Sequence, residues 1–235
     1  MFINEFAPDH IINEGPYDPG IFKAVFLAGG PGSGKSYVAG QLLTNTGLRS
    51  VNSDEVYEYL AKKQNFDLSD PDRVASDQGQ EIRNRAKEIS RNRERHYLDG
   101  RIGLIIDGTG KDVSKYENMA QKLRAIGYDC MMIFVNTSLE VAQQRNMQRE
   151  RSVPKEMVEK MWRQVQDNIM GFQQVFGADK FFVVDNSGGL EDPKRKKNFD
   201  VVRKNLQNFI DAKPTSRKAK QWIQQQLKDR GATDY

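Results

Sequence analysis

The sequence contains few of the residues that disulfide-rich proteins and metal sites need. Among 235 residues there is 1 cysteine, Cys130, so no disulfide can form within the chain and a reducing compartment is expected. The 2 histidines, His10 and His96, are far apart and have no cysteine partner, so we expect no zinc site. Cys130 lies in the apolar run 130–135, where we expect a small buried hydrophobic residue rather than a nucleophile.

Long apolar segments are also missing. No apolar run approaches the roughly 20 residues that a membrane-spanning helix needs. The first residues lack the basic and apolar regions of a secretory signal peptide. We therefore expect a cytoplasmic protein without a membrane partner.

Positive charge is concentrated near the C-terminus. Residues 193–235 carry 12 Lys and Arg against 4 Asp and Glu, although the whole chain has a net charge of only +4. A basic segment of this kind can bind nucleic acid by releasing counterions from the phosphates. It can equally be the solvated face of a helical tail, and no zinc finger or aromatic RNA-binding signature favours either interpretation.

Residues 29–36 (GGPGSGKS) fit the G-x-x-x-x-G-K-[ST] pattern of a phosphate-binding loop. The apolar, strand-like run 21–28 precedes them, and residues 37–43 can continue as a helix. Such a turn directs backbone N–H groups at an anion bound to the helix N-terminus. The pattern predicts that Lys35 reaches the β- and γ-phosphates of ATP and that Ser36 binds Mg²⁺. The predicted ATP-binding residues are Gly30, Pro31, Gly32, Ser33, Gly34, Lys35 and Ser36.

Strand-like and helical segments alternate along the chain. A helix is expected at 53–61, a long polar helix at 73–97, and further helices from a capping box of Thr137 and Glu140 and from Pro154. Five strands alternating with helices predict an α/β P-loop NTPase of the kinase type, with a parallel sheet covered on both faces. The predicted strands are 21–28, 48–52, 103–107, 130–135 and 181–185. The predicted domains are an N-terminal arm (1–20), a kinase domain (21–192) and a basic helical tail (193–235).

Two acidic residues follow predicted strands. Asp54 comes after the second strand and Asp107 ends the third, so both are expected at the carboxyl edge of the sheet, where ligands bind. Asp107 has the position of a Walker B acid that holds Mg²⁺, or else caps the turn after its strand. Asp54 can accept the proton of an attacking hydroxyl, or else serves as a helix N-cap.

Three arginines lie near one another in the sequence. Arg145 and Arg149 are four residues apart on one predicted helix and so share a face, and Arg151 follows in the next connection. Beside a phosphate loop, three guanidinium groups can neutralise the charge that develops during phosphoryl transfer. The alternative is a solvated basic face. Residues 186–189, after the fifth strand, are expected near the adenine.

These motifs resemble those of two groups of P-loop kinases. Residues 104–111 (LIIDGTGK) and 125–128 (AIGY) are similar to a stretch of the zeta toxins, which are kinases of nucleotide sugars. Residues 145–149, 152–154 and 161–162 resemble the lid of phage polynucleotide 5′-kinases. Residues 51–54 resemble the segment that carries the catalytic base of those kinases.

The resemblance covers roughly residues 22–185 and implies functions for single residues. It implies that Asp54 acts as the base, and that Asp107 and Thr109 lie near the acceptor or the metal. Arg145 and Arg149 would belong to the lid. Polynucleotide kinases carry an arginine three residues after the base, where this chain has Tyr57, and this difference argues against a polynucleotide acceptor.

We therefore expect an ATP- and Mg²⁺-dependent phosphotransferase that acts on a hydroxyl of a nucleotide sugar, a nucleotide or a related small molecule. A polynucleotide 5′-hydroxyl kinase is one alternative, and a non-kinase ATP-dependent switch that binds nucleic acid is another. A GTPase is not expected because no N-K-x-D motif follows Asp107. A mechanical ATPase is not expected because Gly108 stands where a second acid is usual.

Overall fold

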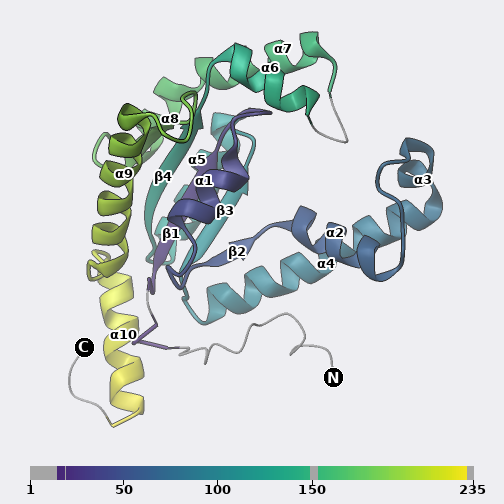
Figure 1. Cartoon of the computed structure of the whole chain (residues 1–235). Helices are drawn as coiled ribbons and strands as arrows, with labels where there is room; N and C mark the ends of the chain where they lie inside the picture. The colour runs from purple at the N-terminus through teal and green to yellow at the C-terminus, as the bar shows by residue number, and fades with distance from the viewer. Residues whose placement is uncertain (1–14, 19, 149–152, 232–235) are drawn as a thin grey trace.

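The computed structural model describes residues 15–18, 20–148 and 153–231. Its strands are β1 (Lys23–Ala28), β2 (Arg49–Val51), β3 (Leu104–Gly108), β4 (Asp129–Asn136) and β5 (Phe181–Asp185). These strands form one sheet in the order β2-β3-β1-β4-β5, and every neighbouring pair is parallel (Figure 1). The predicted α/β fold with a five-stranded parallel sheet is therefore confirmed. The strand that leads into the phosphate loop, β1, lies at the centre.

Helices follow the strands along the chain. Those of the described residues are α1 (Lys35–Leu42), α2 (Ser53–Lys63), α3 (Pro71–Ala75), α4 (Asp77–Asp99), α5 (Val113–Ala125), α6 (Leu139–Met147), α7 (Lys155–Asp167), α8 (Ile169–Phe176), α9 (Pro193–Asp211) and α10 (Arg217–Asp229). None of these described helices is long and apolar enough to cross a membrane.

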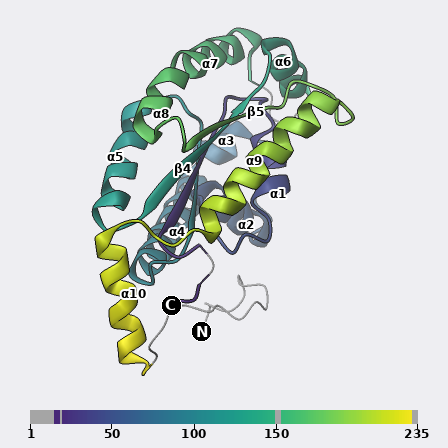
Figure 2. The ribbon, with the colours of Figure 1, turned by 90° about the vertical axis from the view of Figure 1, so that its left-hand side faces the viewer.

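The side chains of β1 alternate between two apolar layers. Ala24 and Phe26 pack with residues of α5, α8 and α10 on one face of the sheet. Val25 and Leu27 pack with residues of α1 and α9 on the other face. Figure 2 shows the sheet between these two groups of helices. Because both faces are covered, the edges of the sheet remain for ligands, and in such sheets the carboxyl edge is the usual site.

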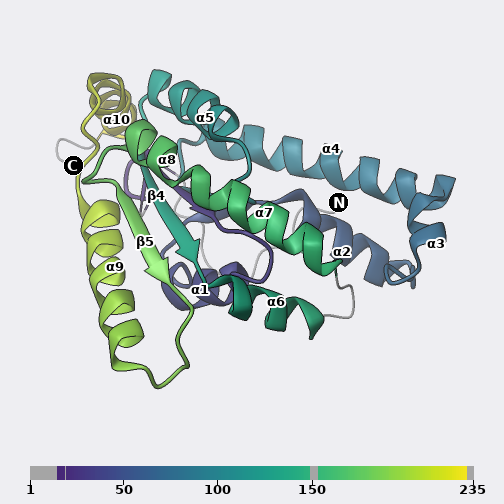
Figure 3. The same ribbon diagram turned by 90° about the horizontal axis from the view of Figure 1, so that it is seen from above.

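The helices α2, α3 and α4 form an arm that extends beyond the sheet (Figures 1 and 3). The arm has a small core of its own, which is made of Val56, Tyr57, Ala61, Phe66, Ile82 and Ala86. The prediction of one helix over 73–97 is wrong, because Ser76 separates α3 from α4. Ser76 has extended backbone, with ψ at 163°, and its side chain caps the Gly79 N–H at 3.3 Å.

The start of α6 also differs from the prediction. The N-cap is Ser138, whose Oγ accepts from the Val141 N–H at 3.3 Å, and not Thr137. The Thr137 hydroxyl is buried, and among the described residues it has no hydrogen-bond partner. The capping residue therefore lies one position later than the Thr137–Glu140 pattern indicates.

The C-terminal helices are helical as predicted, and they pack into both apolar cores. Phe199 and Leu206 of α9 belong to one core, whereas Ile223 of α10 belongs to the other. The segment before α10 is fastened to the amino end of β4, where Asp129 accepts hydrogen bonds from the backbone N–H of Thr215 at 3.1 Å and from its hydroxyl.

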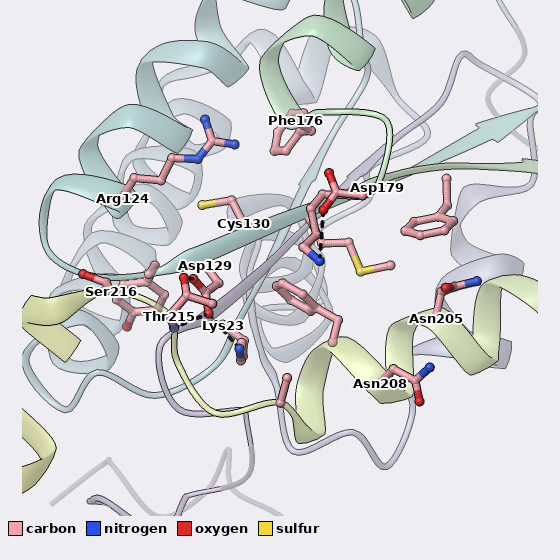
Figure 4. A pocket seen from close by; sticks show the side chains of 16 residues that line it. Lys23, Arg124, Asp129, Cys130, Phe176, Asp179, Asn205, Asn208, Thr215 and Ser216 are labelled. Atoms are coloured by element: carbon pink, nitrogen blue, oxygen red, sulfur yellow. Dashed lines mark hydrogen bonds and ion pairs between the residues drawn. The ribbon is translucent and has the colours of Figure 1, made fainter. Parts of the chain in front are cut away.

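A cavity of about 450 Å³ lies beside these hydrogen bonds, at the edge of the sheet opposite the phosphate loop (Figure 4). The buried ammonium of Lys23 donates to Asp129 at 2.8 Å, so the charge of the carboxylate is already compensated within the protein. Lys23 also lies 5.0 Å from the centre of the Phe209 ring of α9. These contacts join the C-terminal segment to the sheet.

Candidate functional site

The phosphate loop adopts a conformation that requires glycine at two positions. Gly32 and Gly34 have φ angles of +75° and +78°, which other residues rarely adopt. A Cβ atom on Gly32 would lie 2.3 Å from the carbonyl oxygen of Ala142, and one on Gly34 would lie 2.3 Å from Nδ2 of Asn186. The loop is therefore packed tightly against α6 and the segment after β5.

The N-terminus of α1 is open to an anion. Its N-cap, Gly34, provides no side-chain hydrogen bond, and its first turn contains no acidic residue. The first N–H groups of a helix have no partner within the helix, and the helix dipole adds partial positive charge there. Proteins commonly bind phosphate at such helix N-termini, so this end of α1 is the candidate phosphate site.

Lys35 and Asp107 meet at the carboxyl edge of the sheet. The Lys35 ammonium donates a short hydrogen bond to Oδ1 of Asp107. Asp107 reaches this position because β3 lies beside β1, with Asp107 paired to Leu27. The hydroxyl of Tyr116 on α5 accepts from the N–H of Gly110 at 3.2 Å and so holds the loop after β3. Burial raises the pKa of Tyr116, so this hydroxyl stays protonated.

A cavity of about 590 Å³ lies between the arm and the sheet. Asp54, Asp107 and Thr109 all line it, so the three residues predicted to face the acceptor lie around one space. The N-cap of α2 is Asn52, whose Oδ1 accepts from the Asp54 N–H at 2.9 Å. Asp54 is therefore not the helix cap, and its carboxylate accepts no hydrogen bond from the described part of the chain.

Basic side chains surround the same cavity. Lys87 and Arg91 lie one turn apart on α4, Lys111 comes from the segment between β3 and α5, and Lys115 from the first turn of α5. Within the described ranges none of the four forms an ion pair. Four acids also line the cavity. Asp107 accepts from Lys35, and Asp112 accepts from the Lys115 N–H as the N-cap of α5. The other two are Asp54 and Glu94.

One of the three predicted arginines can be placed. Arg145, on α6, donates through Nη1 to the carbonyl oxygens of Gly32 and Ser33 at 3.4 and 3.3 Å. Its Nη2 donates to the carbonyl oxygen of Asn186 at 2.8 Å. Arg145 thus contacts the phosphate loop itself. Arg149 and Arg151 lie outside the described residues.

Two contacts that hold the phosphate loop were not predicted from the sequence. Asn186 binds the phosphate loop through its amide, and Arg195 of α9 binds Asn186. Residues 186–189 were expected near the adenine, but Arg195 was assigned to the basic tail. The spacing does contain a signal, because Arg195 shares a helical face with the buried residues Phe199 and Val202.

Comparison with known proteins gives the family. A family model described as an AAA domain (AAA_33) matches residues 25–170. The chain belongs to this family. No curated protein matches the sequence.

The similar solved structures include several kinases. A chain from the PezAT chromosomal toxin–antitoxin system of Streptococcus pneumoniae has 17% identity and a TM-score of 0.53, covering 84% of this chain and 91% of that one. A putative kinase from Chloroflexus aurantiacus has 14% identity and a TM-score of 0.48, covering 78% and 97%. A chain of the Pnkp1/Rnl/Hen1 RNA repair complex has 23% identity and a TM-score of 0.47, covering 64% and 46%. The predicted resemblance to P-loop kinases is confirmed at the level of family and fold.

Proposed function

We propose that the protein is an ATP-dependent phosphotransferase that moves the γ-phosphate to a hydroxyl of a small acceptor, such as a nucleotide sugar or a nucleotide. The observation that supports this most is the common cavity of Asp54, Asp107 and Thr109 beside the phosphate loop. It provides a place for an acceptor next to the place for ATP, which a protein that only binds ATP does not need.

Each residue of the site has a separate function in this proposal. Lys35 and the N–H groups at the start of α1 bind the phosphates, and Arg145 holds the loop in place. ATP would replace the contact between Lys35 and Asp107 and free the carboxylate. Asp54 accepts the proton of the acceptor hydroxyl, because its carboxylate lines the cavity and is not used as the helix cap.

The residues also fit a magnesium ion. The Ser36 hydroxyl and the Asp107 carboxylate are hard oxygen ligands, and Mg²⁺ usually takes one or two protein groups together with phosphate oxygens and water. No cluster of three or more His, Cys, Asp or Glu occurs among the described residues, which agrees with a metal brought in with ATP rather than a protein cage. Bound there, Mg²⁺ would neutralise charge on the phosphates.

The charges of the cavity favour an acceptor that carries an anion away from the reacting hydroxyl. Asp54, at the start of α2, and Asp107, in β3, both line the cavity, and they would repel a phosphate oxygen acting as nucleophile. Lys87 and Arg91 on the arm have no ion-pair partner among the described residues and can bind the anionic part of the acceptor. Nucleotides and nucleotide sugars combine both groups.

Transfer of radiolabelled γ-phosphate from ATP to a panel of acceptors tests this proposal. The panel contains nucleotide sugars, nucleosides, nucleoside monophosphates and oligonucleotides with a 5′-hydroxyl. We expect label on a sugar hydroxyl of a nucleotide-type acceptor. Label only on a phosphate oxygen, or release of phosphate to water with every acceptor, would contradict it.

A further inference from the structure

A buried arginine of α9 is joined to the phosphate loop through one amide side chain. Arg195 is 7% exposed, and its Nε and Nη2 donate to Oδ1 of Asn186 at 3.1 and 2.9 Å. Nδ2 of Asn186 donates in turn to the carbonyl oxygen of Ser33 at 2.8 Å. These contacts link a helix of the C-terminal segment to the backbone of the loop.

Aromatic packing fixes the orientation of Arg195. Its guanidinium lies over the rings of Tyr37 and Phe199, at 5.0 and 4.7 Å from their centres. Tyr37 follows Lys35 by two residues, in the first turn of α1. A planar guanidinium that is both stacked and hydrogen-bonded has little conformational freedom. The orientation of Arg195 is therefore set before any ligand binds.

Two arginines, Arg145 and Arg195, donate hydrogen bonds to Asn186. Arg145 donates to the backbone carbonyl oxygen of Asn186, and Arg195 donates to its side-chain oxygen. Neither arginine forms an ion pair among the described residues. Burial and the charge of Arg195 lower the pKa of Arg145. A bound polyphosphate would relieve this repulsion.

We propose that Arg195 is a positioning residue for nucleoside triphosphate binding, which acts through Asn186 to hold the phosphate loop in the conformation that binds phosphate. The proposal rests on the proposed function, because the loop must bind ATP for this contact to matter. Coupling between two sites is reciprocal, so ATP should also strengthen the attachment of α9 to the loop.

Binding of a fluorescent methylanthraniloyl-ATP with Mg²⁺ to the full-length chain tests the proposal. Arg195→Lys keeps the charge but loses the two-pronged hydrogen bond. Asn186→Asp keeps an acceptor for Arg195 but replaces the donor to Ser33 with a carboxylate oxygen. We expect each variant to raise the Kd about tenfold. Arg195→Lys loses a hydrogen bond from a charged group, and Asn186→Asp turns a hydrogen bond to Ser33 into a repulsive contact between two oxygen atoms. The melting temperature without nucleotide should change little in Asn186→Asp, because its carboxylate still accepts from Arg195 and its backbone carbonyl still accepts from Arg145.

Lys197→Met is the matched control, because it removes one positive charge from an exposed position two residues further along α9. It should leave the Kd unchanged. Unchanged Kd values for Arg195→Lys and Asn186→Asp would overturn the inference even though the loop binds ATP. A lower melting temperature with unchanged Kd would overturn it too, because Arg195 would then only stabilise the fold. Failure of the wild-type chain to bind the nucleotide would instead contradict the proposed function, and the inference with it.

Discussion

Asp54 is the residue whose substitution should separate the chemical step from the binding of ATP most directly. Its carboxylate lines the acceptor cavity, whereas Asn52 supplies the cap of α2. We expect Asp54→Asn to lower kcat by roughly 10²–10⁴-fold, the usual contribution of a general base. Affinity for ATP should change little, because Asp54 does not belong to the phosphate loop.

Transfer assays and ATP titrations on this variant give the two quantities. Asn52→Ala is the control, because it removes the helix cap and should lower stability by about 1 kcal/mol without a comparable loss of kcat. Loss of ATP binding in Asp54→Asn would indicate a structural or metal-binding residue instead of a base.

Cys130 is a residue whose chemistry follows from its burial, as the apolar run 130–135 predicts. Burial raises the pKa of its thiol from the ordinary 9.0 to about 12. The folded state thus holds this proton more tightly than the unfolded state. Its contribution to the free energy of unfolding is complete below pH 9 and is lost as the pH rises from 9 toward 12.

Urea unfolding between pH 7 and 10.5 measures this contribution. The free energy of unfolding of the wild-type chain should fall above pH 9, and Cys130→Ala should fall less steeply. Burial also raises the pKa values of Tyr116 and Tyr128, so part of the alkaline loss should remain in the variant. Identical slopes for the two proteins would show that the thiol does not contribute.

Residues in short motifs were the easiest to propose as site residues, because their roles depend on neighbours that are close in the sequence. The glycine and lysine positions of the phosphate loop, and acids placed directly after strands, were predicted from spacing alone. Arg195 was not, because its neighbours Lys194, Lys196 and Lys197 are exposed and the run reads as one basic cluster. Its side chain contacts Asn186, in the loop before α9, and Tyr37, which is distant in the sequence.

At the scale of secondary-structure elements, the N-cap of α6 shows how one of two adjacent hydroxyl residues sets where a helix begins. Ser138 supplies the cap, while the Thr137 hydroxyl is buried and lacks a partner within the described residues. We expect Ser138→Ala to destabilise the protein by about 1 kcal/mol, as for a lost N-cap. Thr137→Val keeps the shape and removes an unpaired hydroxyl, so it should be neutral or stabilising.

Chemical denaturation of the two variants under one condition compares them directly. The assignment of the cap is wrong if Thr137→Val destabilises the protein more than Ser138→Ala. The sequence pattern could not decide between adjacent hydroxyl residues, because both are acceptable caps. The choice depends on tertiary contacts such as the hydrogen bond from the Ser138 N–H to the Ser187 hydroxyl at 2.9 Å.

At the scale of the whole molecule, the strand content was predictable and the arrangement was only partly so. Apolar runs of strand length and their alternation with helices indicate a parallel sheet covered on both faces. The position of the arm depends on the packing of α2 against α4, which residues 53–99 do not reveal by periodicity. The acceptor cavity forms between the arm and the sheet, so its basic lining could not be predicted from the sequence.

The packing of the C-terminal helices determines how nucleic-acid binding by the basic tail can be tested. Deleting residues 193–235 would remove Phe199, Leu206 and Phe209 from the core, and we expect the truncated chain to unfold. Substitution of exposed lysines avoids this loss. Lys197 and Lys204 are seven residues apart on α9, so they share an exposed face.

If this face of α9 binds nucleic acid, Lys197→Gln with Lys204→Gln should weaken the binding and flatten its dependence on salt. Each phosphate contact contributes close to one unit of slope in a plot of log affinity against log salt concentration, so we expect a reduction of up to about two units. Fluorescence anisotropy of a labelled oligonucleotide at several salt concentrations measures the slope. Lys122→Gln with Lys160→Gln, on α5 and α7, removes the same charge elsewhere and should leave the slope unchanged. Equal slopes for both double variants, or no affinity of the wild-type chain at low salt, would mean that these lysines only keep the helix solvated.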